Sequence, residues 1–377
     1  MPYTRAAFGC KARYQSTKNA GTHLSRKKHY LESFLPSIKL AHNPLLEGFS
    51  HETKVTILAS YAAYLLSGAT ILAISIRVAT VKLYLKAVAD YFHDHRKFNP
   101  TLDETGAQPE LLRSLYHEAS RWEKMPNRAE PLTPDMVEFF HNRAQSAHEN
   151  SAIAAIADWM IFGLQTGFRV SEYAQSHSAM TKPLHETVTK NVDSTSKAFI
   201  ASDFTFFGAN RRPIAKNKRH TAPFVHITWR FQKNGQNGEE IPFARNNTKP
   251  QFCAVRAAYR IIKRAERLNQ TKNLLIAISV SPNKKTKGLT YLTSTFISKQ
   301  LKLAAHHAHG ITKKDDLKKF TPHSPRVGAC VLLHLLKKQP DFIKKRLRWR
   351  SDTYEDYLRH INHVASAHVE ALNSFAS

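Results

Sequence analysis

Apolar residues recur at helical spacing near the start of the chain. Two such stripes lie between residues 52 and 96, separated by the pair Ser67-Gly68, which is typical of a helix break. The stripes consist of Ile57, Tyr61, Tyr64 and Leu65, and then of Val81, Leu85, Val88 and Phe92. Thr80 is expected to cap the second helix, and a shorter helix is expected over 111–122. The pattern predicts a small all-helical domain over residues 45–128.

The first stripe also lies in a stretch whose length and lack of charge are compatible with a transmembrane helix. Residues 55–76 contain no charged side chain and are numerous enough to span a bilayer. The stretch is interrupted, however, by Ser60, Ser67, Gly68, Thr70 and Ser75, and the Ser-Gly pair favours a turn inside it. We therefore expect a buried helix followed by a turn, and no membrane partner.

In the second part of the chain, the spacing of apolar residues changes from helical to strand-like and then back to helical. Thr133-Pro134 predicts a helix start, and residues 152–164 form a strongly apolar helical segment. Residues 224–232 alternate as a strand does, and residues 240–244 follow the turn sequence KNGQNG as a partner strand. Helical spacing resumes at residue 255. The prediction is a mainly α fold with a small antiparallel β-sheet, in a second domain over residues 129–377.

The strong positive charge of the chain limits the kinds of molecule that it is expected to bind. The chain of 377 residues has 56 Lys and Arg against 29 Asp and Glu, a net charge of +27. Such self-repulsion favours a polyanionic partner, with nucleic acid ahead of an anionic membrane surface or a merely solvated basic surface. Cys10, Cys253 and Cys330 are far apart and odd in number, which predicts neither a disulfide framework nor a zinc site. A reducing, intracellular compartment fits best.

The N-terminal residues 1–44 are expected to form a basic, disordered arm. Residues 1–31 contain seven Lys and Arg and no acidic residue. The arm could bind DNA, carry a nuclear signal around SRKK, or act as an Arg-rich organellar transit peptide. Location in the nucleus is expected if the source is eukaryotic, and in the cytoplasm otherwise.

Three separated segments carry candidate chemistry. In TGFRVSE, Gly167 permits a tight turn, Arg169 stands where a helix begins, and Glu172 shares its helical face and can hold the guanidinium. In HSPR, His323 and Arg326 lie one turn apart, so that both can reach a single phosphate. The third segment, WRSDTYEDYLR, covers residues 349–359.

In this order the segments resemble the tyrosine recombinase (phage integrase) family, over residues 45–377. The family pattern is an Arg, a Lys on a β-hairpin, His-x-x-Arg, a His or Trp, and a nucleophilic Tyr. The residues that match it are Arg169, Lys233, His323, Arg326, Trp349 and Tyr357. The Ser-Asp that follows two residues after Trp349, and the YLR beyond it, are similar to the eukaryotic, crypton-like mobile-element branch.

The resemblance implies cleavage and rejoining of DNA through a covalent 3′-phosphotyrosine. The two arginines and His323 would bind the phosphate oxygens, and Lys233 would protonate the leaving 5′-oxygen. Trp349 can donate one hydrogen bond and pack, but it cannot transfer a proton. Tyr357 would be the nucleophile, with Tyr354 as its competitor three residues earlier. No metal, ATP or other cofactor is required by this scheme.

DNA contacts are expected on basic residues outside the motifs. These residues are Lys82, Lys86, Lys344, Lys345, Arg346, Arg348 and Arg350. His306, His307 and His309 lack an acid or Cys at ligand spacing and are interpreted as a solvated helix end rather than a metal site.

Several functions remain open at this point. The leading hypothesis is a site-specific recombinase or integrase of a mobile element, acting on double-stranded DNA. The alternatives are a type IB topoisomerase-like relaxing enzyme, a domesticated DNA-binding protein without catalysis, and a basic membrane-surface protein.

Beyond residue 359, apolar residues recur at roughly helical spacing, which predicts a C-terminal amphipathic helix. Such a helix can pack on its own domain or dock on a neighbouring subunit. The resemblance implies docking on a neighbour, in a homotetramer on two paired sites that forms from free monomers.

Overall fold

The computed structural model divides the chain into two compact units, Met1–Pro126 and Asn127–Ser377. The boundary lies two residues before the one expected from sequence. The structure describes residues 23–68, 76–96, 98–103, 105–123, 128–174, 198–230, 232, 237–270, 275–280, 288–349 and 351–358. Lys233, Arg350 and the expected C-terminal helix lie outside the described residues.

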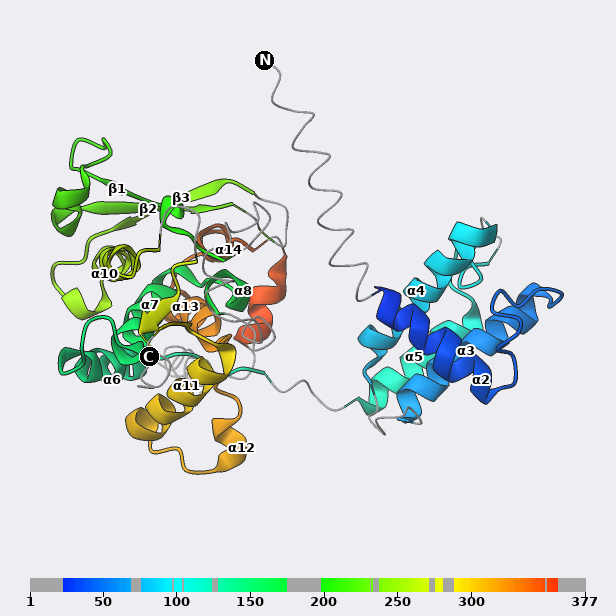
Figure 1. Cartoon of the computed structure of the whole chain (residues 1–377). Helices are drawn as coiled ribbons and strands as arrows, with labels where there is room; N and C mark the ends of the chain where they lie inside the picture. The colour runs from blue at the N-terminus through cyan, green and yellow to red at the C-terminus, as the bar shows by residue number, and fades with distance from the viewer. Residues whose placement is uncertain are drawn as a thin grey trace, which may run out of the picture. The chain divides into compact units, whose positions relative to one another are not determined.

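The first unit is helical throughout its described elements (Figure 1). A helical stretch over residues 23–29 precedes the named elements. The elements are η1 (Tyr30–Phe34), α2 (Leu35–Ser37), α3 (His51–Ser67), α4 (Val78–Arg96) and α5 (Glu110–Trp122). Among the described residues, no helix is long and apolar enough to cross a membrane. Instead, α3 ends at Gly68, whose left-handed φ of 74° terminates the helix where the Ser-Gly pair predicts.

The expectation of a disordered arm over residues 1–44 is wrong for residues 23–44. Tyr30, Phe34 and Leu35 are buried and pack against Tyr61 and Leu65 of α3. The physical reason is a hydrophobic stripe that the dense positive charge obscures in the sequence, because burial of large aromatic side chains outweighs the repulsion between solvated cations.

The start of α4 also differs from the prediction. The helix begins at Val78, so Thr80 lies inside it rather than capping it. The Glu123 carboxylate, from the residue after α5, accepts a hydrogen bond from the backbone N–H of Val78. A carboxylate from a distant part of the chain therefore satisfies an N-terminal donor of α4.

The second unit contains the helices and sheets expected from sequence, together with elements that were not predicted. Its helices are α6 (Pro134–Gln145), α7 (Ala152–Thr166), α8 (Val170–Tyr173), α10 (Ala254–Arg267), α11 (Ser294–His309), α12 (Lys314–Leu317), α13 (Ser324–Leu335) and α14 (Pro340–Leu347). Short 3-10 turns occur at η3 (Ala201–Asp203), η4 (Lys216–Thr221), η5 (Pro250–Phe252) and η6 (Asp352–Tyr357). The strands are β1 (Phe204–Phe207), β2 (Phe224–Trp229), β3 (Glu239–Ala244), β4 (Ile278–Val280) and β5 (Leu289–Tyr291).

Helix α7 is the centre of this unit. It contacts α6, α10 and α13, and nearly all of its side chains are buried (Figure 1). The antiparallel sheet has the order β1-β2-β3, with Trp229 at the end of β2 paired with Glu239 at the start of β3. A helix surrounded on all sides is apolar nearly all round, which explains the apolar sequence of α7; the buried Asp158 is paired with Arg260 and Arg264. Its C-terminal end can therefore hold the following turn rigidly.

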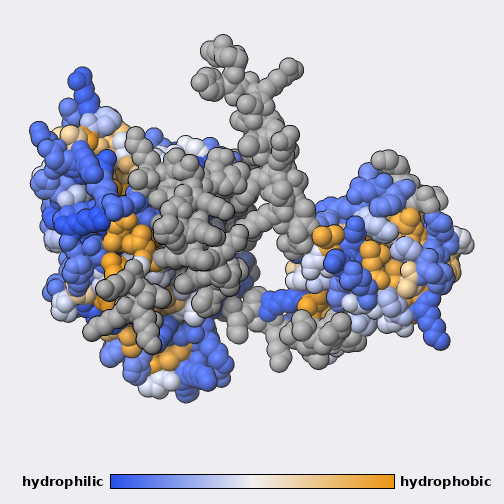
Figure 2. Space-filling view, in the orientation of Figure 1, coloured by the Kyte–Doolittle hydropathy of each residue, from blue (hydrophilic) through white to orange (hydrophobic). Residues whose placement is uncertain are grey.

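The outer surface of both units is mainly hydrophilic in the view of Figure 2, where apolar side chains form smaller, separate patches. The fold is thus mainly α with a small antiparallel sheet, as the sequence predicts.

Candidate active site

The turn after α7 positions the first motif. Gly167 has a φ of 56°, and a Cβ at this position would lie 2.8 Å from Cδ2 of Leu347. Glycine is favoured both by the left-handed backbone and by the close approach of the neighbouring side chain. The turn makes Arg169 the N-cap residue of α8, so the chain reverses and presents its guanidinium beside Glu172.

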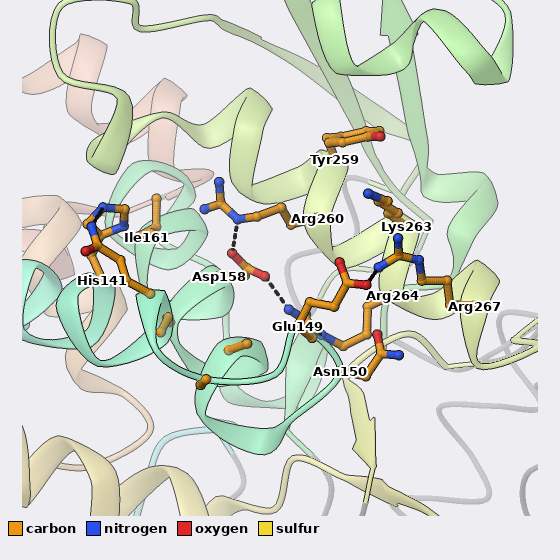
Figure 3. A pocket seen from close by; sticks show the side chains of 15 residues that line it. His141, Glu149, Asn150, Asp158, Ile161, Tyr259, Arg260, Lys263, Arg264 and Arg267 are labelled. Carbon is orange, nitrogen blue, oxygen red and sulfur yellow. Dashed lines mark hydrogen bonds and ion pairs between the residues drawn. The ribbon is translucent and has the colours of Figure 1, made fainter.

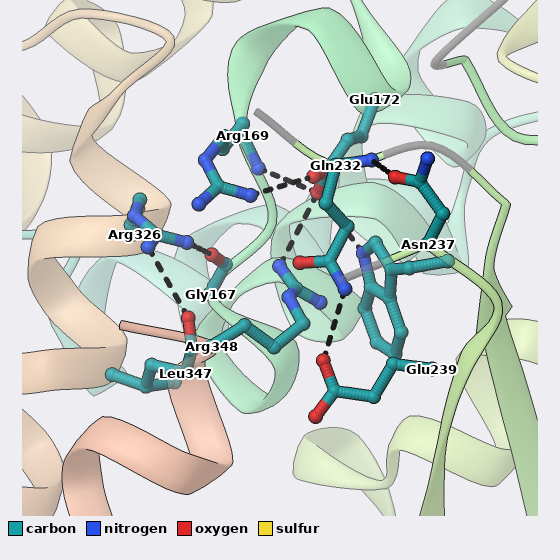
Figure 4. Close-up of polar contacts among 10 residues, drawn as sticks. Gly167, Arg169, Glu172, Gln232, Asn237, Glu239, Arg326, Leu347 and Arg348 are labelled. Carbon is teal, nitrogen blue, oxygen red and sulfur yellow. Dashed lines mark hydrogen bonds and ion pairs between the residues drawn. The ribbon is translucent and has the colours of Figure 1, made fainter. Parts of the chain in front are cut away.

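Glu172 is the hub of a buried polar cluster (Figure 4). Its carboxylate accepts hydrogen bonds from the backbone N–H of Arg169 at 2.8 Å and from Nη1 of Arg169 at 3.4 Å. It also accepts from Nε1 of Trp229 at 3.1 Å and from Nη2 of Arg348 at 3.3 Å. Three of these donors meet at Oε2 and one at Oε1, so the ionised carboxylate accepts from three different residues. The contact between Glu172 and Arg169 is the one that their spacing predicts.

Removing this carboxylate should be strongly destabilising. We expect Glu172→Ala to lower the free energy of unfolding by about 3–5 kcal/mol, because it leaves the buried Arg348 charge without its counterion. Glu172→Gln keeps an acceptor oxygen and should lose less. Denaturant titration of the three proteins measures the difference. An alanine variant as stable as the wild type would contradict the role of Glu172 as a hub.

Arg326 is held deep in the site by main-chain carbonyl groups. It lies in the first turn of α13 and is only 4% exposed. Its Nη1 donates to the carbonyl oxygen of Gly167 at 2.6 Å, and its Nη2 donates to that of Leu347 at 3.2 Å. The guanidinium carbon lies 4.5 Å from the ring centroid of Trp349. Burial, and then the positive charge of Arg169, lower the pKa of Arg326 to about 9, so it remains a cation at neutral pH.

Tyr357, at the end of η6, is the tyrosine that meets the motif residues. Its hydroxyl lies 2.9 Å from Nε2 of His323, and its ring packs edge-on against Trp349 with a centroid separation of 5.0 Å. Tyr354 is buried in a small apolar cluster that includes Cys330 and Ile343, and its ring centroid lies 6.5 Å from that of Trp349. The hydroxyl of Tyr357 contacts His323 as well. The arrangement favours Tyr357 over Tyr354 as the reactive phenol.

Burial leaves both the Tyr357 phenol and the His323 imidazole uncharged at neutral pH. Burial raises the pKa of the Tyr357 hydroxyl above its ordinary value, an effect that the charge of Arg326 opposes. Burial, and then the charges of Arg326 and Arg169, lower the pKa of His323 to about 4. His323 is therefore neutral at neutral pH, and its Nε2 can accept a proton from Tyr357 when Nδ1 carries the ring hydrogen.

The low pKa of His323 predicts a pH-dependent stability. Below about pH 6.5 an unfolded chain protonates this ring, whereas the folded protein does not do so until about pH 4. The free energy of unfolding should fall by about 3 kcal/mol from this group as pH drops through that window, and the contribution should level off below it. Denaturant titrations of wild type and His323→Gln at several pH values isolate this contribution. A stability difference between the two proteins that stays constant with pH would contradict it.

The basic run on α14 does not form one exposed surface. Lys345 is exposed, whereas Lys344 pairs with Asp341 at 3.0 Å and with Asp352 at 3.2 Å. Arg346 packs over the ring of Phe243, at 4.0 Å from its centroid. The expectation that Arg348 contacts DNA is wrong for this structure, since its side chain is 0% exposed and bound to Glu172. Contact with DNA stays a prediction for Lys345, Lys344 and Arg346.

In the first unit, Lys82 and Lys86 lie on the outer face of α4, as the stripe predicts. Lys86 pairs with Asp90 at 2.9 Å, and the Lys82 ammonium lies 5.0 Å from the ring centroid of Tyr116. Exposed pairs of this kind are weak, so both cations remain available to phosphate.

Sequence reasoning missed two residues that shape the site. Arg128 donates to the backbone carbonyl of Asp356 and pairs with its carboxylate at 3.5 Å, beside Tyr357. Trp229 donates to Glu172 from the end of β2. Both contacts join segments far apart in sequence, and no local pattern signals them.

A separate cavity of about 290 Å³ lies between α7 and α10 (Figure 3). Asp158 accepts from Nη2 of Arg264 at 2.5 Å and from Nε of Arg260, and Arg267 pairs with Glu149. None of the motif residues lines this cavity. The cluster joins the two helices by ion pairs and lies apart from the tyrosine.

The solved structures that this chain resembles include two integrases and a site-specific recombinase, each determined with DNA. The Tn1549 transposon integrase, in complex with transposon right end DNA, is 14% identical with a TM-score of 0.42, over 91% of this chain and 99% of that chain. A lambda integrase dimer bound to a COC′ core site is 16% identical with a TM-score of 0.42, over 89% and 94%. The XerH site-specific recombinase bound to difH substrate is 15% identical with a TM-score of 0.39, over 86% and 71%. No protein-family model and no curated protein matches the chain.

Proposed function

We propose that the chain is a tyrosine recombinase that cleaves and rejoins double-stranded DNA, in the service of a mobile element. The observation that carries the proposal is the contact of the Tyr357 hydroxyl with Nε2 of His323 at 2.9 Å, one helical turn from the buried guanidinium of Arg326. A phenol, a neutral base and a buried cation in one place are what attack on a phosphodiester requires.

The chemistry follows from these groups. The Tyr357 oxygen attacks phosphorus while its proton passes to His323, and the bond from phosphorus to the 5′-oxygen breaks. Arg169 and Arg326 neutralise the charge that grows on the non-bridging oxygens. The 5′-oxygen leaves with a proton, for which Lys233 is the expected donor. The 3′-phosphotyrosine keeps the energy of the broken bond, so a 5′-hydroxyl can reverse the step without an added energy source.

Trapping of the covalent intermediate tests the proposal. Duplex oligonucleotides with a nick, randomised around it, would be incubated with the protein and separated under denaturing conditions. A nick just beyond the attacked phosphate lets the short 5′-hydroxyl fragment diffuse away, which prevents rejoining. We expect a 5′-end label on the cleaved strand to migrate with the protein and to be released by protease. Absence of any adduct from a pool that the protein demonstrably binds would overturn the proposal.

A type IB topoisomerase would use the same chemistry, but its products differ from those of a recombinase. It would relax supercoiled plasmids that lack the sequence recovered from the pool. A recombinase should instead join two duplexes that both carry this sequence. We propose that four copies act on two such sites, and that the motif after Trp349 places the protein with the eukaryotic, crypton-like branch.

A further inference from the structure

Arg348 occupies an unfavourable position immediately before Trp349. Its φ of 59° is in the left-handed region, where a residue other than glycine is strained. Its side chain is 0% exposed, so its charge is removed from water. Strain and desolvation together persist only where the surroundings hold the residue firmly. The local contacts of Arg348 must therefore offset both the backbone strain and the desolvation of its charge.

Its contacts show what it holds. The guanidinium carbon lies 3.7 Å from the ring centroid of Trp229, and Nη2 lies 3.3 Å from Oε2 of Glu172. Trp229 donates to the same Oε2. Figure 4 shows Arg348 reaching Glu172 from one side while Arg169 reaches it from another. The end of α14, strand β2 and helix α8 thus meet at one carboxylate.

The two arginines differ in what they can reach. Arg169 has a side chain that is 21% exposed, so it can contact a ligand at the surface of the site. Arg348 is enclosed and cannot. Burial lowers the pKa of Arg348 to about 10, which leaves it charged at neutral pH and able to orient the Glu172 carboxylate.

We propose that Arg348 is a positioning residue for DNA cleavage: through Glu172 it sets the orientation of Arg169, without itself touching DNA. The proposal rests on the proposed function. It also explains why a basic residue stands at a strained, enclosed position at the end of α14.

The test compares Arg348→Met, which keeps the bulk of the side chain, with Arg348→Lys, which keeps the charge. The duplex recovered from the nicked pool serves as substrate. Three quantities are measured well below the unfolding temperature: the single-turnover rate constant of adduct formation at saturating protein, the Kd for the duplex, and Tm. Misplacement of a group by about 1 Å can cost about 100-fold in rate. We expect Arg348→Met to lower the rate constant about 10–100-fold with Kd within about threefold, and Arg348→Lys to recover part of the loss.

A double variant separates positioning from simple support of the fold. If Arg348 acts through Glu172, Arg348→Met should reduce the rate little further in a Glu172→Gln background. Additive losses, an unchanged rate constant, or a loss of rate matched by an equal loss of DNA affinity would overturn the proposal. Absence of adduct from the wild type would instead overturn the proposed function, and the positioning role with it.

Discussion

Replacement of Tyr357 by phenylalanine should abolish the covalent protein–DNA adduct, while DNA affinity stays within a few-fold of the wild type. The substitution removes the hydroxyl that lies 2.9 Å from His323 and keeps the ring that packs against Trp349. Without the phenol oxygen no phosphotyrosine can form, so the loss should be complete rather than partial. The measurement is adduct yield on the nicked duplex, beside a Kd from the same preparation.

Tyr354→Phe is the matched control for this prediction. Tyr354 lies in the same 3-10 turn, yet it is buried beside Cys330 and Ile343. Its phenylalanine variant should form adduct at close to the wild-type rate. If this variant loses the adduct and Tyr357→Phe retains it, the identity of the nucleophile is wrong.

DNA affinity should fall steeply with salt. If the protein neutralises about six to ten phosphates, affinity for duplex DNA should drop about 10³–10⁵-fold between about 50 and 200 mM salt, because each contact releases condensed counterions. The net charge of +27 supplies the cations, and random-sequence duplex is sufficient for the measurement. A flat response would show that little of this charge faces DNA.

The structure sharpens this experiment by separating exposed from enclosed cations. Replacing Lys82 and Lys86 together by glutamine should reduce the slope of log affinity against log salt by about two, and Lys345→Gln by about one. Arg348→Met should leave the slope unchanged, since its side chain is enclosed. A reduced slope for Arg348→Met would mean that the residue reaches phosphate after all.

Local signals predicted the framework of the site well. The turn at Gly167, the N-cap at Thr133 and the contact of Glu172 with Arg169 each depend on residues within a few positions, where backbone geometry fixes the outcome. Strand β1 was missed because four residues carry too little pattern, and its pairing partner lies about twenty residues later.

Two further errors share one cause, which is that charge was taken to mean exposure. Residues 23–44 were assigned to an arm, although Tyr30 and Phe34 are buried. Arg348 was assigned to a DNA-facing run, although it is enclosed with Glu172 and Trp229. A cation can be buried wherever the tertiary fold supplies a carboxylate and an aromatic face, and both partners here come from distant segments.

The two carbonyl groups that hold Arg326 bear on how DNA is recognised. An arginine side chain loses about 0.5–1.5 kcal/mol of conformational freedom when a partner immobilises it. Here folding has already immobilised Arg326, through Gly167 and Leu347, before any DNA arrives. The guanidinium is preorganised, so no rotamer search accompanies binding. On the proposed function, the scissile phosphate must come to a fixed cation, and the DNA backbone supplies whatever adjustment the encounter needs.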